Sequence, residues 1–201
     1  MTYQPIVNGV IETQPLNPNE KFINSENSPI GDKTILDYWR WAFSDLVVNT
    51  GRGFLAEYLI AMAVGSEKPV RGSWDSYDIQ APDGTRIEVK SASYVQSWYQ
   101  KELSKIQFSI GKTSEWFPEK GIYGDDKARW SKVYVFCLLA HSEKADINPL
   151  DLRQWKFYVI PTAVLNRDLG EAQSISLSKV KKYSETLTFG QIPKAIEKCL
   201  Q

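Results

Sequence analysis

Apolar residues recur at helical spacing in two neighbouring segments of the first third of the chain. The first segment runs from about Ile35 to Val48, and Asp32-Lys33-Thr34 can cap its first turn. Asn49-Thr50-Gly51 interrupts the pattern and can cap a second helix over about 53–64, after which Gly65 is typical of a helix end. The pattern therefore predicts two consecutive helices.

From Arg71 onward the pattern changes to the alternation that is typical of strands. Strands are expected over 77–81 and 86–92, joined by the tight-turn sequence Pro82-Asp83-Gly84. The nearly continuous apolar run 132–140 predicts a central strand that is buried on both faces. The remaining expected elements are a short strand at 105–110, a loop at 111–126, a strand at 155–161, a turn or short helix at 161–166 and a closing helix at 191–200.

This order of helices and strands favours an α/β fold with a mixed sheet over a helical bundle or a β-sandwich. Residues 1–31 are rich in Asn, Pro, Ser and Glu, a composition that does not sustain regular structure for long. We expect them to form an extended N-terminal arm that packs over the domain or over a partner subunit. Residues 32–201 have the length of one ordinary domain.

Composition and charge exclude several classes of function. Lys plus Arg equals Asp plus Glu, 24 each, which excludes a strongly basic nucleic-acid coat but not a local basic groove. The two cysteines and one histidine are too few for a disulfide framework, a four-thiolate zinc site or a His-rich metal site. Cys137 falls within the apolar run, where we expect its thiol to pack. His141 follows that run, so a strand-end position is favoured over a catalytic triad.

The sequence also gives an expectation for cellular location. Its apolar stretches are shorter than the roughly 18 residues of a membrane-spanning helix. The first residues, Met1-Thr2-Tyr3-Gln4-Pro5, have neither the basic start nor the apolar core of a secretory signal. We therefore expect a cytoplasmic protein that does not contact membranes.

The turn at Pro82-Asp83-Gly84 predicts the register of the hairpin around it. The usual three-residue loop of this kind pairs Ala81 with Thr85, which places Asp78 opposite Glu88. Because side chains alternate along a strand, Lys90 then lies on the same face as both carboxylates. Like charges on directly opposite residues are destabilising, so either Lys90 or a divalent cation is needed between them. The alternative is a solvated strand face with a modest ion pair.

The second helix contains one further acidic residue in an unusual setting. Glu57 is the only charged residue of the segment 54–64 and shares its stripe with apolar side chains. A carboxylate in such a place is costly unless it is paired or coordinated. Glu57 is therefore either ion-paired with Arg52 or Arg71, or it is a third acidic group of a site made with Asp78 and Glu88.

A helix with an embedded glutamate, then an Asp, then Glu-x-Lys on the partner strand, resembles the PD-(D/E)XK nuclease superfamily. The matching residues are Glu57, Asp78 and Glu88-Val89-Lys90. The resemblance covers about residues 34–161 and implies a restriction-endonuclease-like fold, a mixed β-sheet core flanked by α-helices. The sequence departs from the pattern in one respect, because Tyr77 stands where the motif has proline.

The resemblance implies a Mg²⁺-dependent endonuclease that hydrolyses DNA phosphodiester bonds by means of a metal-activated water, in restriction or another form of defence. Asp78 and Glu88 would hold Mg²⁺, for which Mn²⁺ would substitute, and the Val89 carbonyl and Glu57 would be further ligands. Lys90 would orient or help deprotonate the attacking water and stabilise charge on phosphorus. Cutting two strands would favour a homodimer.

Polar, aromatic and basic residues follow the Glu-x-Lys strand, and this interleaving is typical of a nucleic-acid groove. The candidate contacts in this segment are Gln96, Trp98, Lys101 and Lys105, and Arg129 is a further candidate from the later loop. The alternative for the first segment is a packed amphipathic segment whose aromatic side chains belong to the core. Two alternatives to a DNA nuclease also stay open: a non-catalytic DNA-binding or assembly module with the same fold, and a hydrolase of RNA or another phosphodiester.

Overall fold

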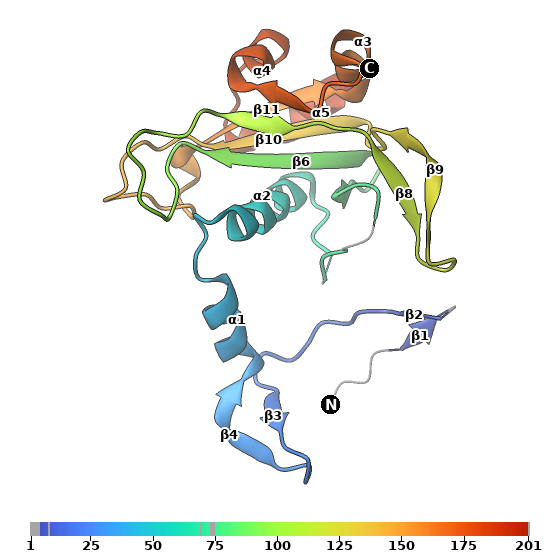
Figure 1. Ribbon diagram of the computed structural model, residues 1–201, viewed down its shortest axis with the longest axis vertical. Helices are drawn as coiled ribbons and strands as arrows, with labels where there is room; N and C mark the ends of the chain where they lie inside the picture. Colours follow the sequence, from blue (N-terminus) through green and yellow to red (C-terminus); the bar gives the residue numbers. More distant parts are fainter. Residues whose placement is uncertain (1–4, 8, 69, 73–74, 201) are drawn as a thin grey trace.

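The computed structural model describes residues 5–7, 9–68, 70–72 and 75–200. It shows a mixed α/β protein with a four-stranded mixed sheet between helices, and the described residues contain five α-helices and several two-stranded sheets (Figure 1). Within that part of the chain, no helix has the length and apolar character needed to cross a membrane. The α/β fold class with a mixed sheet is therefore confirmed.

The four-stranded sheet has the strand order β11-β10-β6-β5. Its strands are β5 (Ile79–Gln80), β6 (Arg86–Ser93), β10 (Val133–Leu139) and β11 (Trp155–Pro161). β10 is parallel to β6, whereas the β5–β6 and β10–β11 pairs are antiparallel. Every residue of β10 is buried, so the prediction of a central buried strand at 132–140 is confirmed, as is the strand at 155–161.

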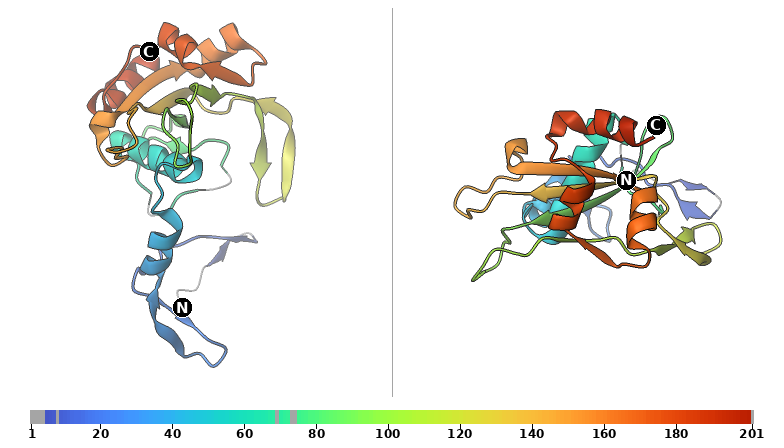
Figure 2. Two further views of the ribbon diagram at one scale, coloured as in Figure 1. Left: turned by 60° about the vertical axis from the view of Figure 1, so that its left-hand side comes forward. Right: turned by 90° about the horizontal axis from the view of Figure 1, so that it is seen from above.

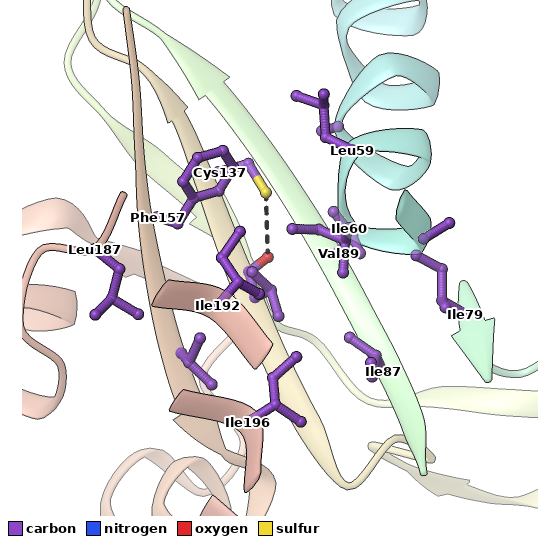
Figure 3. Packing of buried hydrophobic residues seen from close by; sticks show 14 of the residues in the cluster. Leu59, Ile60, Ile79, Ile87, Val89, Cys137, Phe157, Leu187, Ile192 and Ile196 are labelled. Atoms are coloured by element: carbon purple, nitrogen blue, oxygen red, sulfur yellow. Dashed lines mark hydrogen bonds between the residues drawn. The ribbon is translucent and has the colours of Figure 1, made fainter. Parts of the chain in front are cut away.

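One face of this sheet is covered by α2 (Asn49–Val64) and α5 (Ile192–Leu200). Figure 3 shows Ile60 of α2 and Ile192 of α5 on this face together with Val89 and Cys137 of the sheet. Burial raises the pKa of the Cys137 thiol, so this side chain acts as a small apolar group, as expected. The closing helix predicted over 191–200 is confirmed by α5.

The opposite face is covered by α3 (Thr162–Leu169), α4 (Leu177–Tyr183) and a small sheet of β7 (Gln107–Ser109) with β12 (Ser174–Ser176). Because side chains alternate along β10, the strand contributes to the hydrophobic core on each face of the sheet. Val135 belongs to the core on the α2 side and Phe136 to the core on the α3 side. The body therefore has three layers, with the sheet in the middle (Figure 2).

The prediction of a loop over 111–126 is wrong. The segment forms most of an antiparallel hairpin, β8 (Thr113–Phe117) and β9 (Ile122–Ala128). Trp116 and Tyr123 are cross-strand partners whose ring centroids are 4.7 Å apart, and aromatic pairs of this kind stabilise a hairpin. Gly121 takes a positive φ of 63° in the turn, so the turn formers mark the end of a hairpin rather than a long loop.

Short strands occur in the N-terminal arm predicted over residues 1–31. Two short hairpins begin there, β1 (Ile6–Val7) with β2 (Val10–Ile11) and β3 (Lys21–Ile23) with β4 (Pro29–Thr34). Figures 1 and 2 show these hairpins and α1 (Ile35–Phe43) projecting from the layered body. The Asn24 side chain supports the β3–β4 turn, because its Oδ1 accepts hydrogen bonds from two backbone N–H groups of that turn.

The two predicted helices exist with shifted boundaries. α1 ends at Phe43 instead of continuing to Val48, because Asp45 Oδ1 accepts from the backbone N–H groups of Val47 and Val48 at 3.0 Å each. This local turn competes with helical hydrogen bonding. α2 then begins at Asn49 and ends with Gly65 in the left-handed conformation, as its sequence predicts.

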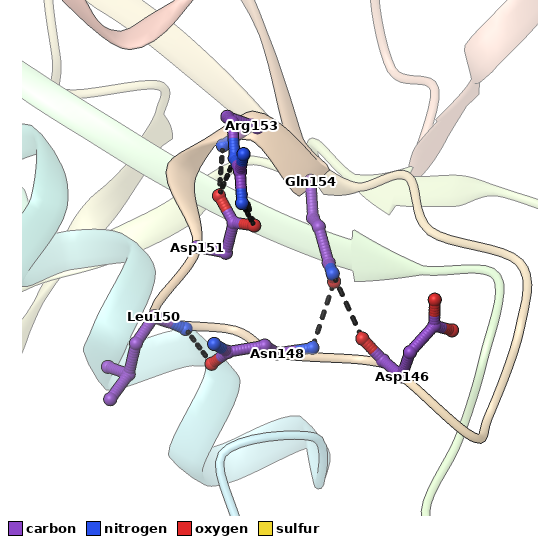
Figure 4. Close-up of polar contacts among 6 residues, drawn as sticks. All are labelled: Asp146, Asn148, Leu150, Asp151, Arg153 and Gln154. Atoms are coloured by element: carbon purple, nitrogen blue, oxygen red, sulfur yellow. Dashed lines mark hydrogen bonds and ion pairs between the residues drawn. The ribbon is translucent and has the colours of Figure 1, made fainter.

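A polar loop leads into β11 and fixes where that strand begins (Figure 4). The Gln154 side chain accepts from the Asn148 N–H at 2.9 Å and donates to the Asp146 carbonyl at 3.0 Å. Asp151 caps the short 3₁₀ turn η1 (Leu152–Gln154) and is ion-paired with Arg153. A second 3₁₀ turn, η2 (Phe189–Gln191), precedes α5.

Candidate active site

The hairpin that carries the candidate acids has the predicted register. Ile79 lies opposite Ile87, and the Ala81 N–H donates to the Thr85 carbonyl at 2.9 Å. Regular pairing on the first strand is shorter than expected, since β5 contains only Ile79 and Gln80. Asp78 precedes β5, yet its N–H donates to the Ile87 carbonyl at 3.1 Å. The backbone therefore holds Asp78 against the beginning of β6.

Asp78, Glu88 and Lys90 are brought together at this edge of the sheet. Lys90 Nζ lies 2.5 Å from Glu88 Oε1. Asp78 Oδ2 accepts from the backbone N–H of Val89 at 2.7 Å, which turns the aspartate side chain toward β6. The Glu88 and Lys90 side chains are partly buried, with exposed fractions of 19% and 29%. The cluster is therefore a half-buried site rather than a fully solvated strand face.

Burial and mutual charge explain the electrostatics of the cluster. Burial raises the pKa of Glu88, the negative charge of Asp78 raises it further, and Lys90 opposes both effects. For Lys90, burial acts to lower the pKa, but the charges of Glu88 and Asp78 outweigh burial and raise it. Lys90 is therefore an ammonium cation at neutral pH.

Glu57 of α2 is ion-paired with Arg71, one of the two pairings that the sequence left open. The Arg71 side chain donates to both carboxylate oxygens of Glu57, to Oε1 at 3.0 Å and to Oε2 more closely. Burial raises the pKa of Glu57, and the charge of Asp78 adds to this effect while Arg71 opposes it. Arg52 instead donates to the Val47 carbonyl and to Asn49 at 2.7 Å each. Glu57 therefore borders the cluster, and its charge is already neutralised by the Arg71 guanidinium.

The donor set of the cluster fits a hard divalent cation. Mg²⁺ favours oxygen ligands and is commonly held by one or two carboxylates, with water and phosphate oxygens completing the shell. Asp78 and Glu88 provide two carboxylates, and burial together with the charge of Asp78 keeps the pKa of Glu88 raised although Lys90 lies beside it. Among the described residues, no group of three or more His, Cys, Asp or Glu side chains is placed to hold a metal. The site thus fits an ion with two protein carboxylates.

Val89 supports this arrangement through its backbone. Its side chain is buried in the core on the α2 side, and its N–H is the donor to Asp78. A ligand role for its carbonyl stays a prediction.

The structure separates the five residues expected to contact nucleic acid. Trp98, Lys101 and Lys105 are exposed in the segment that follows β6. Gln96 is buried, and its side-chain amide donates to the Ser93 carbonyl at 3.0 Å. Arg129 is also buried, with an exposed fraction of 6%, and donates to the carbonyls of Ile110 and Gly170. Gln96 and Arg129 thus pack inside the protein, so their side chains do not form part of an exposed nucleic-acid surface.

Two neighbours of the cluster were not identified from the sequence. Ser131 Oγ lies 3.3 Å from Glu88 Oε2, because β10 starts beside β6. Arg86 lies over the Tyr77 ring, with its guanidinium carbon 4.9 Å from the ring centroid. The contact between Ser131 and Glu88 has no signal in the local sequence, because it depends on parallel pairing of distant strands.

No protein-family model matches the chain, and a search of curated proteins finds no match.

Divalent cations are expected to raise the melting temperature of the protein by binding to Glu88. At about 100 times the dissociation constant, a bound ion adds about 2.7 kcal/mol, which corresponds to several degrees in melting temperature. We expect Mg²⁺ or Mn²⁺ to raise the melting temperature of the wild type and to have little effect on Glu88→Gln. The measurement is a thermal melt at increasing ion concentration.

The matched control for this measurement is Glu57→Gln, which removes a carboxylate that Arg71 already neutralises. We expect this variant to retain most of the ion-induced rise. The rise in the wild type should diminish as pH is lowered through the raised pKa of Glu88, because protonation of that carboxyl competes with the cation. Equal responses of wild type and Glu88→Gln would remove Glu88 from the metal site.

Proposed function

We propose that the protein is a Mg²⁺-dependent endonuclease that hydrolyses DNA phosphodiester bonds. One observation carries this proposal: Asp78, Glu88 and Lys90 lie together at the edge of the sheet, with the ammonium group 2.5 Å from one carboxylate. This set combines oxygen ligands for a hard cation with a fixed positive charge for a phosphate.

The order of elements supports a restriction-endonuclease-like core. α2 carries Glu57 and packs on β6, the β5–β6 hairpin carries the acids and the lysine, and β10 and β11 complete a mixed sheet. Helices lie on both faces of that sheet. The resemblance to the PD-(D/E)XK superfamily implies this arrangement, and the proposed membership rests on it together with the residue pattern.

Asp78 and Glu88 would hold the metal ion. When bound, Mg²⁺ polarises a phosphoryl oxygen and lowers the pKa of water. Ser131 and Lys90 restrict the Glu88 side chain from two sides, and the Val89 N–H restricts Asp78. Both carboxylates are therefore held in position before substrate binds.

The Lys90 side chain is best suited to stabilising negative charge on the phosphate. Because its raised pKa keeps it protonated, it cannot accept a proton from water at neutral pH. Of the two roles that the resemblance implies, the positive charge of Lys90 favours stabilisation of negative charge on the phosphate over deprotonation of the nucleophile. Glu57 holds Arg71 at the border of the site and is proposed as a positioning residue instead of a metal ligand.

DNA is the proposed partner, and Trp98, Lys101 and Lys105 are exposed to contact it. The active form is proposed to be a homodimer, because cutting two strands calls for two-fold symmetry. The projecting N-terminal segment carries exposed apolar side chains that such an interface would bury. Examples are Ile6, Ile11 and Ile30.

Plasmid cleavage tests the proposal directly. Purified protein with Mg²⁺ is expected to convert supercoiled plasmid to nicked or linear DNA, and EDTA should stop the reaction. Glu88→Gln should be inactive in the same assay, whereas a single-stranded RNA substrate should remain intact. Cleavage of RNA alone would identify a ribonuclease, and DNA binding without cleavage would identify a non-catalytic module. Either result would overturn the proposal.

A further inference from the structure

A cavity of about 530 Å³ adjoins the proposed active site. It lies between α1, α2 and the segment that leads to β5, and Glu57 and Asp78 are among the residues that line it. Its volume falls in the usual range for small-molecule sites. A group bound in this cavity would therefore lie next to the proposed catalytic cluster.

Aromatic side chains from three parts of the chain line this cavity. They are Trp39, Phe43, Phe54, Tyr58 and Tyr77. Phe54 already holds a planar group, because the Arg71 guanidinium carbon lies 4.8 Å from its ring centroid. Tyr58 has an exposed fraction of 55%, although it belongs to the helix that packs on the sheet. Exposed aromatic faces around a hollow are suited to stacking a planar ring system.

The charged groups of the cavity indicate which planar group would bind. Carboxylates outnumber cations there, since Glu57, Glu67, Asp75 and Asp78 line the cavity together with Lys68 and Arg71. An acidic excess disfavours a phosphate but provides acceptors for amino groups. A nucleobase with an exocyclic amino group offers both a flat aromatic face and such donors.

We propose that this cavity binds one unstacked nucleobase of the DNA strand whose phosphate lies at Asp78 and Lys90. The inference rests on the proposed nuclease function and adds a substrate class to it. A base must leave the helical stack to enter the cavity, and unstacking costs least in single-stranded or distorted DNA. The protein therefore prefers single-stranded or mismatched DNA, and it prefers adenine, cytosine or guanine to thymine at the bound position.

Fluorescence of 2-aminopurine tests the cavity without catalysis. A single-stranded oligonucleotide with one 2-aminopurine is titrated with protein in EDTA, and stacking against the aromatic rings is expected to quench the probe. Trp39→Ala and Tyr58→Ala should weaken binding about tenfold each, in line with the cost of losing one base–aromatic stack. An oligonucleotide in which thymines replace all other bases should bind more weakly than one made of adenines.

The helix α1 offers a matched control. Trp41 is two residues from Trp39 and has an exposed fraction of 84%, but it does not line the cavity. Trp41→Ala should bind the probe like the wild type, with circular dichroism checking that all variants are folded. Equal binding by Trp39→Ala and Trp41→Ala would overturn the nucleobase site. Binding of tetramethylammonium in the cavity, without any quenching of the 2-aminopurine probe by the protein, would also overturn it. Aromatic rings with carboxylates suit organic cations as well.

Plasmid cleavage separates failure of this inference from failure of the nuclease proposal. If the wild type cleaves DNA and the Trp39 and Trp41 variants bind the probe alike, the nucleobase site is wrong and the nuclease proposal stands. If DNA is not cleaved, but Trp39→Ala binds the probe more weakly and Trp41→Ala does not, the nucleobase site stands and the nuclease proposal is wrong.

Discussion

Replacing Lys90 with alanine is expected to slow DNA cleavage about a hundredfold or more, the usual cost of removing one group that stabilises transition-state charge. The side chain is mostly shielded from solvent and is held 2.5 Å from Glu88, so its positive charge is already in place before the reaction. A preorganised charge in a half-buried site is worth more than one in water. The measurement is the single-turnover rate of plasmid cleavage at saturating Mg²⁺.

Binding and stability controls separate this catalytic effect from a structural one. Lys90→Ala leaves the partly buried Glu88 without its cation, which also lowers stability. The double variant Glu88→Gln, Lys90→Met removes both charges and should regain part of the melting temperature without regaining activity. Lys194 of α5 is an exposed lysine away from the site, and Lys194→Ala should cleave like the wild type.

The affinity for DNA should change little in Lys90→Ala, because one lysine contributes a small part of phosphate binding. Fluorescence anisotropy of a labelled oligonucleotide measures it in EDTA. Cleavage at the wild-type rate by a folded Lys90→Ala protein would remove Lys90 from the mechanism.

Local signals in the sequence account for what could be predicted about the site. The turn at Pro82-Asp83-Gly84 sets the pairing of the strands on either side, so the positions of Asp78 and Glu88 follow from a few adjacent residues. The buried stripe of α2 likewise places Glu57 close to the sheet. The rule for the hairpin is reliable because the contact joins residues that are near in sequence.

Contacts between distant segments could not be derived in this way. Ser131 reaches Glu88 only because β10 is parallel to β6, a pairing that crosses about forty residues of chain. The choice of Arg71 over Arg52 as the partner of Glu57 depends on the path of the segment before β5, which has no periodic pattern. Tertiary pairing decides such contacts, and one sequence contains little information about it.

Replacing Arg129 with methionine is expected to lower the free energy of unfolding by about 3 kcal/mol or more, because one buried and three partly buried acceptors lose their donor at once. Its guanidinium donates to the Ile110 carbonyl at 2.7 Å and to Asn166 Oδ1 at 2.8 Å. It also donates to the carbonyls of Gly170 and Ala172 at 2.9 and 3.2 Å. Methionine keeps the apolar stem of the side chain but cannot replace these hydrogen bonds.

The position of Arg129 explains why so many bonds meet there. Gly170 follows the C-terminus of α3, where carbonyl groups lack partners within the helix and a cation is favourable. Ile110 belongs to the segment that follows β7, so one guanidinium joins that segment to the end of α3. Arg129 is a basic residue in a segment that also contains Trp116 and Trp130, which suggested a DNA contact in the sequence, but charge alone does not show whether a side chain is buried.

A thermal melt measures the effect, and the expected fall is roughly 6–12 °C at about 2–4 °C per kcal/mol for a chain of this size. The matched control is Arg153→Met, which removes an arginine whose side chain is 90% exposed and paired only at the surface with Asp151. Such surface pairs contribute little, so its melting temperature should stay close to that of the wild type. At a temperature where both variants are folded, Arg129→Met should bind DNA like the wild type. An unchanged melting temperature together with weakened DNA binding would instead assign Arg129 to the nucleic-acid surface, because a residue that donates to the buried Ile110 carbonyl and to three partly buried acceptors cannot be removed without loss of stability.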